Sequence, residues 1–168
     1  MRLLVIADYQ VDFVDGSLGF PGADKLENKI CDSVKDYDAY VMTLDTHDKS
    51  YLNTVEGRYL PVEHCISGTK GHELYGKVKE LEKGALKIFT KNTFPSLDLA
   101  NWLKDNPYDE IDLCGLVSNI CVISNAIMVK SALPNAKIRI LKDLTDSFDK
   151  VLEQKAFDVL RGLHIEVK

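Results

Sequence analysis

Short runs of Val, Ile and Leu alternate with amphipathic segments along the whole chain. The first, second and fourth of these runs are nearly continuous in apolar character, as strands of a parallel sheet are when both of their faces are buried. The pattern predicts strands at Arg2–Ala7, Ala39–Leu44, Leu86–Thr90, Glu110–Cys114, Lys137–Leu141 and His164–Val167.

The segments between these runs carry apolar residues at helical spacing. In the first of them Leu26, Ile30 and Val34 recur every four residues. The other predicted helices lie around 74–81, at 96–106 with Ser96 as N-cap, at 119–133 before Pro134, and at 149–162. The alternation of strand and helix predicts an α/β fold: a doubly wound, mostly parallel sheet of about six strands with helices on both faces, in three layers.

Size and charge narrow the class of protein. A chain of 168 residues favours a single domain over 1–168. The net charge of −5 argues against nucleic acid or an anionic membrane as the main partner. No apolar run approaches the ~20 residues of a membrane span, and "MRLLVIADYQ" is interpreted as a strand and not as a signal peptide. Four cysteines without CxxC spacing fit reduced thiols, so we expect a cytoplasmic protein.

Polar side chains follow several of the predicted strands. Asp8 follows the first strand, Asp45 and His47 the second, Lys91 the third and Cys121 the fourth. Ligands of doubly wound sheets bind beyond the carboxyl ends of the strands. We therefore expect these acid, base and thiol groups to meet at one edge of the sheet.

Cys121 has two interpretations. A lone cysteine is more often a buried structural thiol than a nucleophile. A nucleophile would need a lowered thiol pKa, which a helix N-terminus and the nearby Lys91 would both favour. In that interpretation Asp8 would be the general base that takes the thiol proton.

Asp45 and His47 also form a possible metal pair on one side of an extended segment. His64 is the candidate third ligand, and Glu56 or Asn53 could lie alongside. Oxygen and imidazole ligands together suit Zn, Mn or Fe. These residues belong to a polar segment without a clear period, and a loop of such length is usually functional. Four further polar residues are expected to be solvated or capping: Gln10, Asp12, Asp48 and His72.

Five ordered motifs resemble one enzyme family. The opening "VIADYQVDF" resembles the D-x-Q-x-D-F start of the isochorismatase-like cysteine hydrolases. The stretches "LDTHD", "PVEHCISGTKGHEL", "FTKNTF" and "CGLVSNICV" follow in the order of that family and look most like its nicotinamidase (pyrazinamidase) branch. The resemblance runs from Val5 to about Ala126, and the five motifs together are far more specific than any one of them.

The resemblance implies a catalytic triad of Asp8, Lys91 and Cys121. Asp8 would be the base, Lys91 would stabilise the thiolate and anionic intermediates, and Cys121 would attack an amide carbonyl. It also implies a cis peptide at Leu116–Val117, which turns the N–H of Val117 towards the oxyanion together with the N–H of Cys121. These residues would make the protein a cysteine amidohydrolase.

The resemblance further implies a metal held by Asp45, His47 and His64, with Glu56 as a ligand that some members add. Zinc is the expected ion, with Mn or Fe as alternatives. The metal would bind the pyridine nitrogen of a small-molecule amide and direct the amide at the thiol. The implied reaction converts nicotinamide to nicotinate and ammonia through a cysteine thioester, in NAD salvage.

The expected substrate pocket consists of Phe13, Leu60, Phe94, Leu116 and Ile120. Leu60 stands where many nicotinamidases have an aromatic residue, so ring stacking would come from Phe13, Phe94 or Tyr59. Ser118-Asn119 replaces the usual Thr-Asp of the nucleophile loop.

Two alternatives stay open. One is a metal-independent hydrolase of another small amide, with an N-carbamoyl or ureido substrate, which would have less use for the Asp45, His47 and His64 set. The other is a non-catalytic α/β module that binds a small ligand, with Asp8 and Asp45 as an acidic pocket. Isochorismatase activity itself does not need Cys121. Relatives are often homo-oligomers, and the sequence leaves the assembly state open.

Overall fold

The computed structural model describes residues 1–168 and has one six-stranded sheet with the strand order β3-β2-β1-β4-β5-β6. Every strand pairs with its neighbours in parallel. The strands are β1 Arg2–Ala7, β2 Ala39–Asp45, β3 Lys87–Lys91, β4 Glu110–Leu116, β5 Lys137–Asp146 and β6 Glu166–Val167. The predicted α/β architecture is therefore confirmed.

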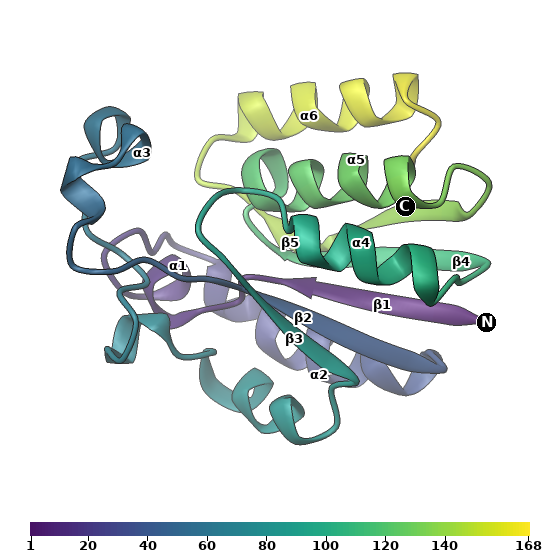
Figure 1. Ribbon diagram of the computed structural model, residues 1–168, viewed down its shortest axis with the longest axis horizontal. Helices are drawn as coiled ribbons and strands as arrows, with labels where there is room; N and C mark the ends of the chain where they lie inside the picture. The colour runs from purple at the N-terminus through teal and green to yellow at the C-terminus, as the bar shows by residue number, and fades with distance from the viewer.

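Helices cover both faces of the sheet (Figure 1). They are α1 Val11–Val14, α2 Glu27–Ser33, α3 Val55–Tyr59, α4 Leu97–Asp105, α5 Ile123–Ala132 and α6 Lys150–Gly162. The chain moves outwards from β1 to β2 and β3, then crosses back to β4 and moves outwards on the other side. Because crossovers are right-handed, this reversal puts α2 on one face and α4, α5 and α6 on the other.

The two faces of β1 explain the two halves of the hydrophobic core. Successive side chains of a strand point to opposite faces, so Leu3 and Val5 pack under α4, α5 and α6, while Leu4 and Ile6 pack under α2. All four side chains are fully buried. The continuous apolar run of the sequence is thus used on both sides, as its pattern predicts.

The boundaries of several elements differ from the sequence predictions. The helix predicted around 74–81 is a 3-10 helix at Gly76–Lys83, which starts at a glycine with a φ of 50°. The last strand is only Glu166–Val167, because His164 before it turns with a φ of 61°. The helix predicted from Asn119 opens with one wide π-type turn at Ser118–Val122. Ser96 caps α4 as predicted, accepting a hydrogen bond from the Leu99 amide at 3.1 Å.

No helix has both the length and the apolar character needed to cross a membrane. The carboxyl ends of β1, β2, β3 and β4 all lie at one edge of the sheet, beside the point where the strand order reverses. Ligand sites of doubly wound sheets form at that point.

A buried network of charged side chains joins β4 and β5 near the amino ends of the strands. The guanidinium of Arg139 on β5 donates to both carboxylate oxygens of Asp112 on β4, at 2.5 and 3.1 Å. The hydroxyl of Tyr37 donates to the same carboxylate at 2.6 Å, and the guanidinium of Arg2 lies 3.6 Å away. Asp112 and Arg139 are 2% and 6% exposed. Removal of either residue would therefore leave the charge of the other poorly compensated in a buried site.

We expect Asp112→Ala to lower the free energy of unfolding by about 3–5 kcal/mol. The change removes the buried carboxylate that accepts two hydrogen bonds from Arg139 and leaves the guanidinium only the half-exposed Glu110 as acceptor. Denaturant unfolding would measure the change. The exposed pair between Lys137 and Glu166, 3.3 Å apart, provides the control. Glu166→Ala should cost less than about 1 kcal/mol. Equal losses for the two variants would contradict the role given to the buried network.

Candidate active site

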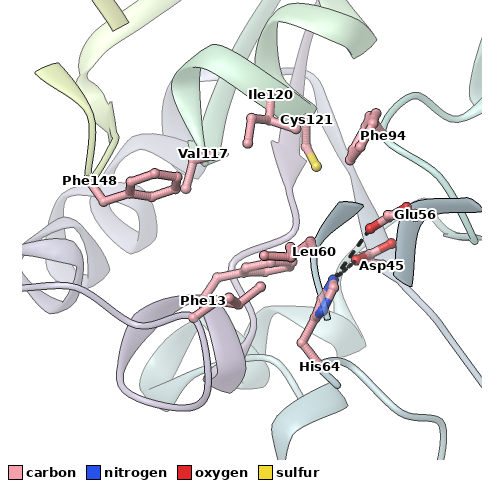
Figure 2. A pocket seen from close by; sticks show the side chains of 11 residues that line it. Phe13, Asp45, Glu56, Leu60, His64, Phe94, Val117, Ile120, Cys121 and Phe148 are labelled. Atoms are coloured by element: carbon pink, nitrogen blue, oxygen red, sulfur yellow. Dashed lines mark ion pairs between the residues drawn. The ribbon is translucent and has the colours of Figure 1, made fainter. Parts of the chain in front are cut away.

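Cys121 lies on the turn that follows β4. The peptide bond between Leu116 and Val117 is cis, as the family resemblance implies, and the π-type turn then carries Cys121 to the start of α5. Its thiol faces a pocket, and its sulfur points into the open space of that pocket (Figure 2). Although the residue is only 5% exposed, the sulfur is not sealed in the core.

The structure brings Asp8 and Lys91 to this thiol. The Lys91 ammonium lies 3.7 Å from the Cys121 sulfur and 2.6 Å from Oδ2 of Asp8. Oδ1 of Asp8 accepts a hydrogen bond from the Thr43 hydroxyl at 2.6 Å. Oδ2 forms the ion pair with Lys91 but accepts no well-aligned hydrogen bond, so it has room for a proton from the thiol. The carboxylate thus comes from the residue after β1, the ammonium from the end of β3 and the thiol from the turn after β4.

The protonation states in this group follow from burial and charge. Burial raises the pKa of the Cys121 thiol well above its ordinary value; Lys91 acts in the opposite direction, and Asp8 adds to the rise. Burial also raises the pKa of Asp8, against the effect of Lys91. For Lys91, burial acts to lower the pKa, but Asp8 and the other negative groups raise it overall. The nucleophile interpretation called for a lowered thiol pKa. In the resting protein the thiol pKa is raised instead, because desolvation outweighs the effect of the ammonium.

An apolar pocket of about 90 Å³ opens in front of the sulfur. Its lining includes four of the predicted pocket residues: Phe13, Leu60, Phe94 and Ile120. The fifth, Leu116, does not line it, because its β4 side chain is fully buried in the core under α2. The sequence prediction missed Leu18 and Phe148, which complete the wall. Both lie on loops without an apolar period, and only the tertiary structure brings them here.

The inner pocket continues into a wider groove of about 570 Å³ on the side of α3. Leu60, Phe94 and Ile120 line both spaces, and Leu60 and Phe94 are 36% and 41% exposed. Tyr59, one of the three candidate stacking residues, lines the groove and is 88% exposed, so it does not reach the inner pocket. The aromatic walls of the inner pocket are Phe13, Phe94 and Phe148.

Four candidate metal ligands meet on the opposite side of this pocket. The donor atoms of Asp45, His47, Glu56 and His64 all lie within 4.8 Å of one another. Oδ2 of Asp45 is 3.1 and 3.3 Å from Nε2 of His47 and His64, and Oε1 of Glu56 is 3.7 and 3.6 Å from the same two atoms. A tetrahedral shell with bonds of about 2.1 Å spaces its donors about 3.4 Å apart. The donor set therefore fits a divalent ion. Asn53 is exposed, so Glu56 is the better fourth ligand.

The charge in this cluster fits a cation as well. Burial and the Asp45 carboxylate raise the pKa of Glu56. Burial acts to raise the pKa of Asp45, but hydrogen bonds from His47 and His64 and the charge of Lys91 lower it far below its ordinary range. The carboxylates of Asp45 and Glu56 thus lie close together in a partly buried cluster, where a divalent ion would offset their repulsion.

Hydrogen bonds with backbone groups orient the candidate ligands. Nδ1 of His64 lies 2.8 Å from the carbonyl oxygen of Val62, which leaves Nε2 for the cluster. The backbone of His47 forms an isolated β-bridge with the segment after His64: its N–H donates to the carbonyl of Cys65 at 3.0 Å, and its carbonyl accepts from the N–H of Ser67 at 2.8 Å. These bonds hold together two ligands that lie far apart in the sequence.

Gln10 and Asp12 fix the same region and are not the solvated or capping residues that the sequence predicted. Gln10 is fully buried, and its amide accepts from the Asp45 N–H at 2.8 Å and donates to the carbonyls of Asp45 and His72 at 2.8 and 2.9 Å. The Asp12 carboxylate accepts from the Cys65 N–H at 2.7 Å. Both residues belong to the motif "VIADYQVDF", so this motif was the sequence signal that could have indicated their structural role. Asp48, in contrast, caps its own exposed turn through Ser50.

A buried cysteine beside a carboxylate and an ammonium, at the carboxyl edge of a parallel sheet, is typical of hydrolases with a thiol nucleophile. The chain belongs to the isochorismatase family, because the family model of the isochorismatase domain matches residues 2–167.

Three relatives illustrate the similarity. The nicotinamidase/pyrazinamidase of Mycobacterium tuberculosis (strain ATCC 25618 / H37Rv) is 29% identical over 188 aligned residues, which cover 99% of this chain and 98% of the relative. The crystal structure of the nicotinamidase PncA from Bacillus subtilis superposes with a TM-score of 0.84 at 27% identity, covering 99% of this chain and 98% of that one. The pyrazinamidase of Pyrococcus horikoshii in complex with zinc has the same fold, with a TM-score of 0.86, 24% identity and coverage of 99% and 98%.

The raised pKa of Cys121 predicts how the thiol reacts with iodoacetamide. Below the pKa the thiolate fraction grows tenfold per pH unit, so the rate of modification should rise about tenfold per unit between about pH 7 and 9. Peptide mass spectrometry would follow Cys121, with the half-buried Cys31 as internal reference. A rate that is already level at about pH 7 would mean a preformed thiolate and would contradict this protonation state.

Proposed function

We propose that this protein is a nicotinamidase, which hydrolyses the carboxamide of nicotinamide to nicotinate and ammonia in NAD salvage. The observation that carries the proposal is the position of the Cys121 sulfur. It faces an apolar, aromatic-walled pocket. The Lys91 ammonium lies beside the sulfur, paired with Asp8, and also lies 3.5 Å from Asp45 of the candidate metal-ligand cluster. The similarity of the whole chain to the M. tuberculosis nicotinamidase/pyrazinamidase supports the same reaction.

The first chemical step forms a thioester. Oδ2 of Asp8 takes the thiol proton as the sulfur adds to the carboxamide carbon, and the N–H groups of Val117 and Cys121 receive the oxyanion. The C–N bond then breaks, and protonated Asp8 gives its proton to the departing nitrogen, which leaves as ammonia. Lys91 keeps its positive charge throughout and stabilises the negative charge on Asp8 and sulfur.

The second step uses water. Asp8, again a carboxylate, takes a proton from a water molecule that attacks the thioester carbon. The C–S bond breaks, the sulfur leaves as a thiolate, and it regains its proton from Asp8. The products are the free thiol and nicotinic acid, which loses its proton to solvent as nicotinate, so the enzyme returns to its resting state with no external reductant or oxidant.

The metal ligands in this proposal are Asp45, His47, Glu56 and His64, and the ion is divalent, with zinc favoured over Mn and Fe. When bound, the ion supplies a Lewis-acid contact for the ring nitrogen of the substrate. Phe13, Leu60, Phe94 and Ile120 surround the ring and shield it from bulk water. Leu60 fills less space than an aromatic residue would, so the ring is held mainly by the phenylalanines.

Hydrolysis of the amide tests the nucleophile. Cys121→Ala should lower ammonia release from nicotinamide by at least about a thousandfold, because no other thiol lines the pocket. A panel of nicotinamide, pyrazinamide and an N-carbamoyl amino acid should show activity with the first two. Cys31→Ala, far from the pocket, is the matched control. Equal rates for wild type and Cys121→Ala would remove the mechanism, and a preference for the N-carbamoyl compound would favour the metal-independent alternative.

Metal analysis tests the cluster independently of turnover. The purified protein should hold about one divalent ion per chain, and His64→Ala should lose it together with the thermal stabilisation that added ion gives. His164→Ala changes an exposed histidine on the turn before β6 and should keep the ion. A metal-free preparation with full activity would rule out the proposed role of the cluster.

A further inference from the structure

Asn125 is a fully buried polar residue of α5, four residues after the nucleophile. Its amide nitrogen donates to the carbonyl oxygen of Cys121 at 2.9 Å and faces that of Phe94 at 3.4 Å. Its amide oxygen accepts from the N–H of Ser96 at 2.9 Å. Both polar atoms of a buried side chain are therefore used, and all partners are backbone groups.

These partners belong to two separate parts of the candidate active site. Cys121 is on the turn after β4, whereas Phe94 and Ser96 follow β3, only a few residues after Lys91. Phe94 lines both the inner pocket and the outer groove. The two segments also meet at the 3.7 Å approach of the Lys91 ammonium to the Cys121 sulfur. The Asn125 amide is thus a backbone link between the segment that carries Lys91 and Phe94 and the turn that carries the thiol.

We propose that Asn125 is a positioning residue, which sets the distance of the Cys121 thiol from Lys91 and from the Phe94 wall of the pocket. This inference rests on the proposed hydrolase function. A polar residue at this buried site has no packing advantage over an apolar one of similar size. The hydrogen bonds of Asn125 to both segments account for a polar side chain at this position. A shift of about 1 Å between nucleophile and substrate can cost about a hundredfold in rate.

A pair of variants isolates the bond to the nucleophile. Asn125→Ala and Asn125→Ser leave nearly the same cavity, but the serine hydroxyl can donate to the carbonyl four residues earlier in its helix, which is that of Cys121. We expect Asn125→Ala to lower kcat with nicotinamide by about ten- to a hundredfold, with a smaller change in KM. Asn125→Ser should recover part of that loss. The rate of Cys121 alkylation should follow the same order.

Asn106→Ala is the matched control, because the Asn106 amide also donates to the carbonyl four residues earlier, that of Trp102, at 2.9 Å, at the far end of α4. All variants are assayed well below their melting temperatures. The proposal is overturned if Asn125→Ala changes only the melting temperature and keeps kcat and alkylation within about twofold of wild type. It is equally overturned if the serine and alanine variants are equally impaired.

The nicotinamidase function and the positioning role of Asn125 can be contradicted independently of each other. If wild type releases no ammonia from nicotinamide, the proposed function fails, while the alkylation rates still test whether Asn125 positions the thiol. If Asn125→Ala does not fold, the comparison is made between wild type, Asn125→Ser and Asn125→Asp. The aspartate retains an acceptor for Ser96 but has no donor for the Cys121 carbonyl. Asn125→Asp should then be the slower of the two variants, and the reverse order contradicts the proposal.

Discussion

The buried ammonium of Lys91 is the group around which this site is organised. It lies 2.6 Å from Asp8, 3.5 Å from Asp45 and 3.7 Å from the Cys121 sulfur, in a side chain that is only 3% exposed. A cation without water is stable only when negative groups surround it. Lys91 therefore requires both carboxylates, and through Asp45 it joins the thiol to the cluster of candidate metal ligands. In the proposed mechanism, the same charge would let Asp8 exchange a proton with the sulfur without leaving an unpaired anion.

The sheet topology makes this arrangement possible. β1, β2, β3 and β4 are neighbours at the point where the strand order reverses, so their carboxyl ends bring Asp8, Asp45, Lys91 and the Cys121 turn to one edge. The buried strands are rigid, and each needs to place only one side chain. The segments between the strands supply the apolar pocket walls and the remaining candidate metal ligands. Figure 2 shows Phe148 and His64 from loops and Glu56 from α3.

Buried amides and carboxylates hold these loops in place. Gln10 fastens the end of β2, Asp12 fastens the backbone after His64, and Asn125 ties the nucleophile turn to the segment after β3. Each of them bonds mainly to backbone groups, which a buried loop must otherwise leave unpaired. The polar interior of this edge is thus a scaffold for the reacting groups and not a set of further reactants.

The sequence alone predicted the α/β class and the approximate strand positions, and its resemblance to a family predicted the candidate residues of the triad and metal cluster. Apolar periodicity depends on burial, and the five motifs contain the reacting groups themselves. Only the tertiary structure decided that Leu116 faces the core, that Leu18 and Phe148 close the pocket, and that Gln10 and Asn125 are buried, because loop conformation and long-range packing leave no local period. It also raised the pKa of the Cys121 thiol, where the nucleophile interpretation had called for a lowered one. A sequence shows that a lysine can approach a cysteine, but desolvation, which here outweighs that lysine, depends on everything packed around the sulfur.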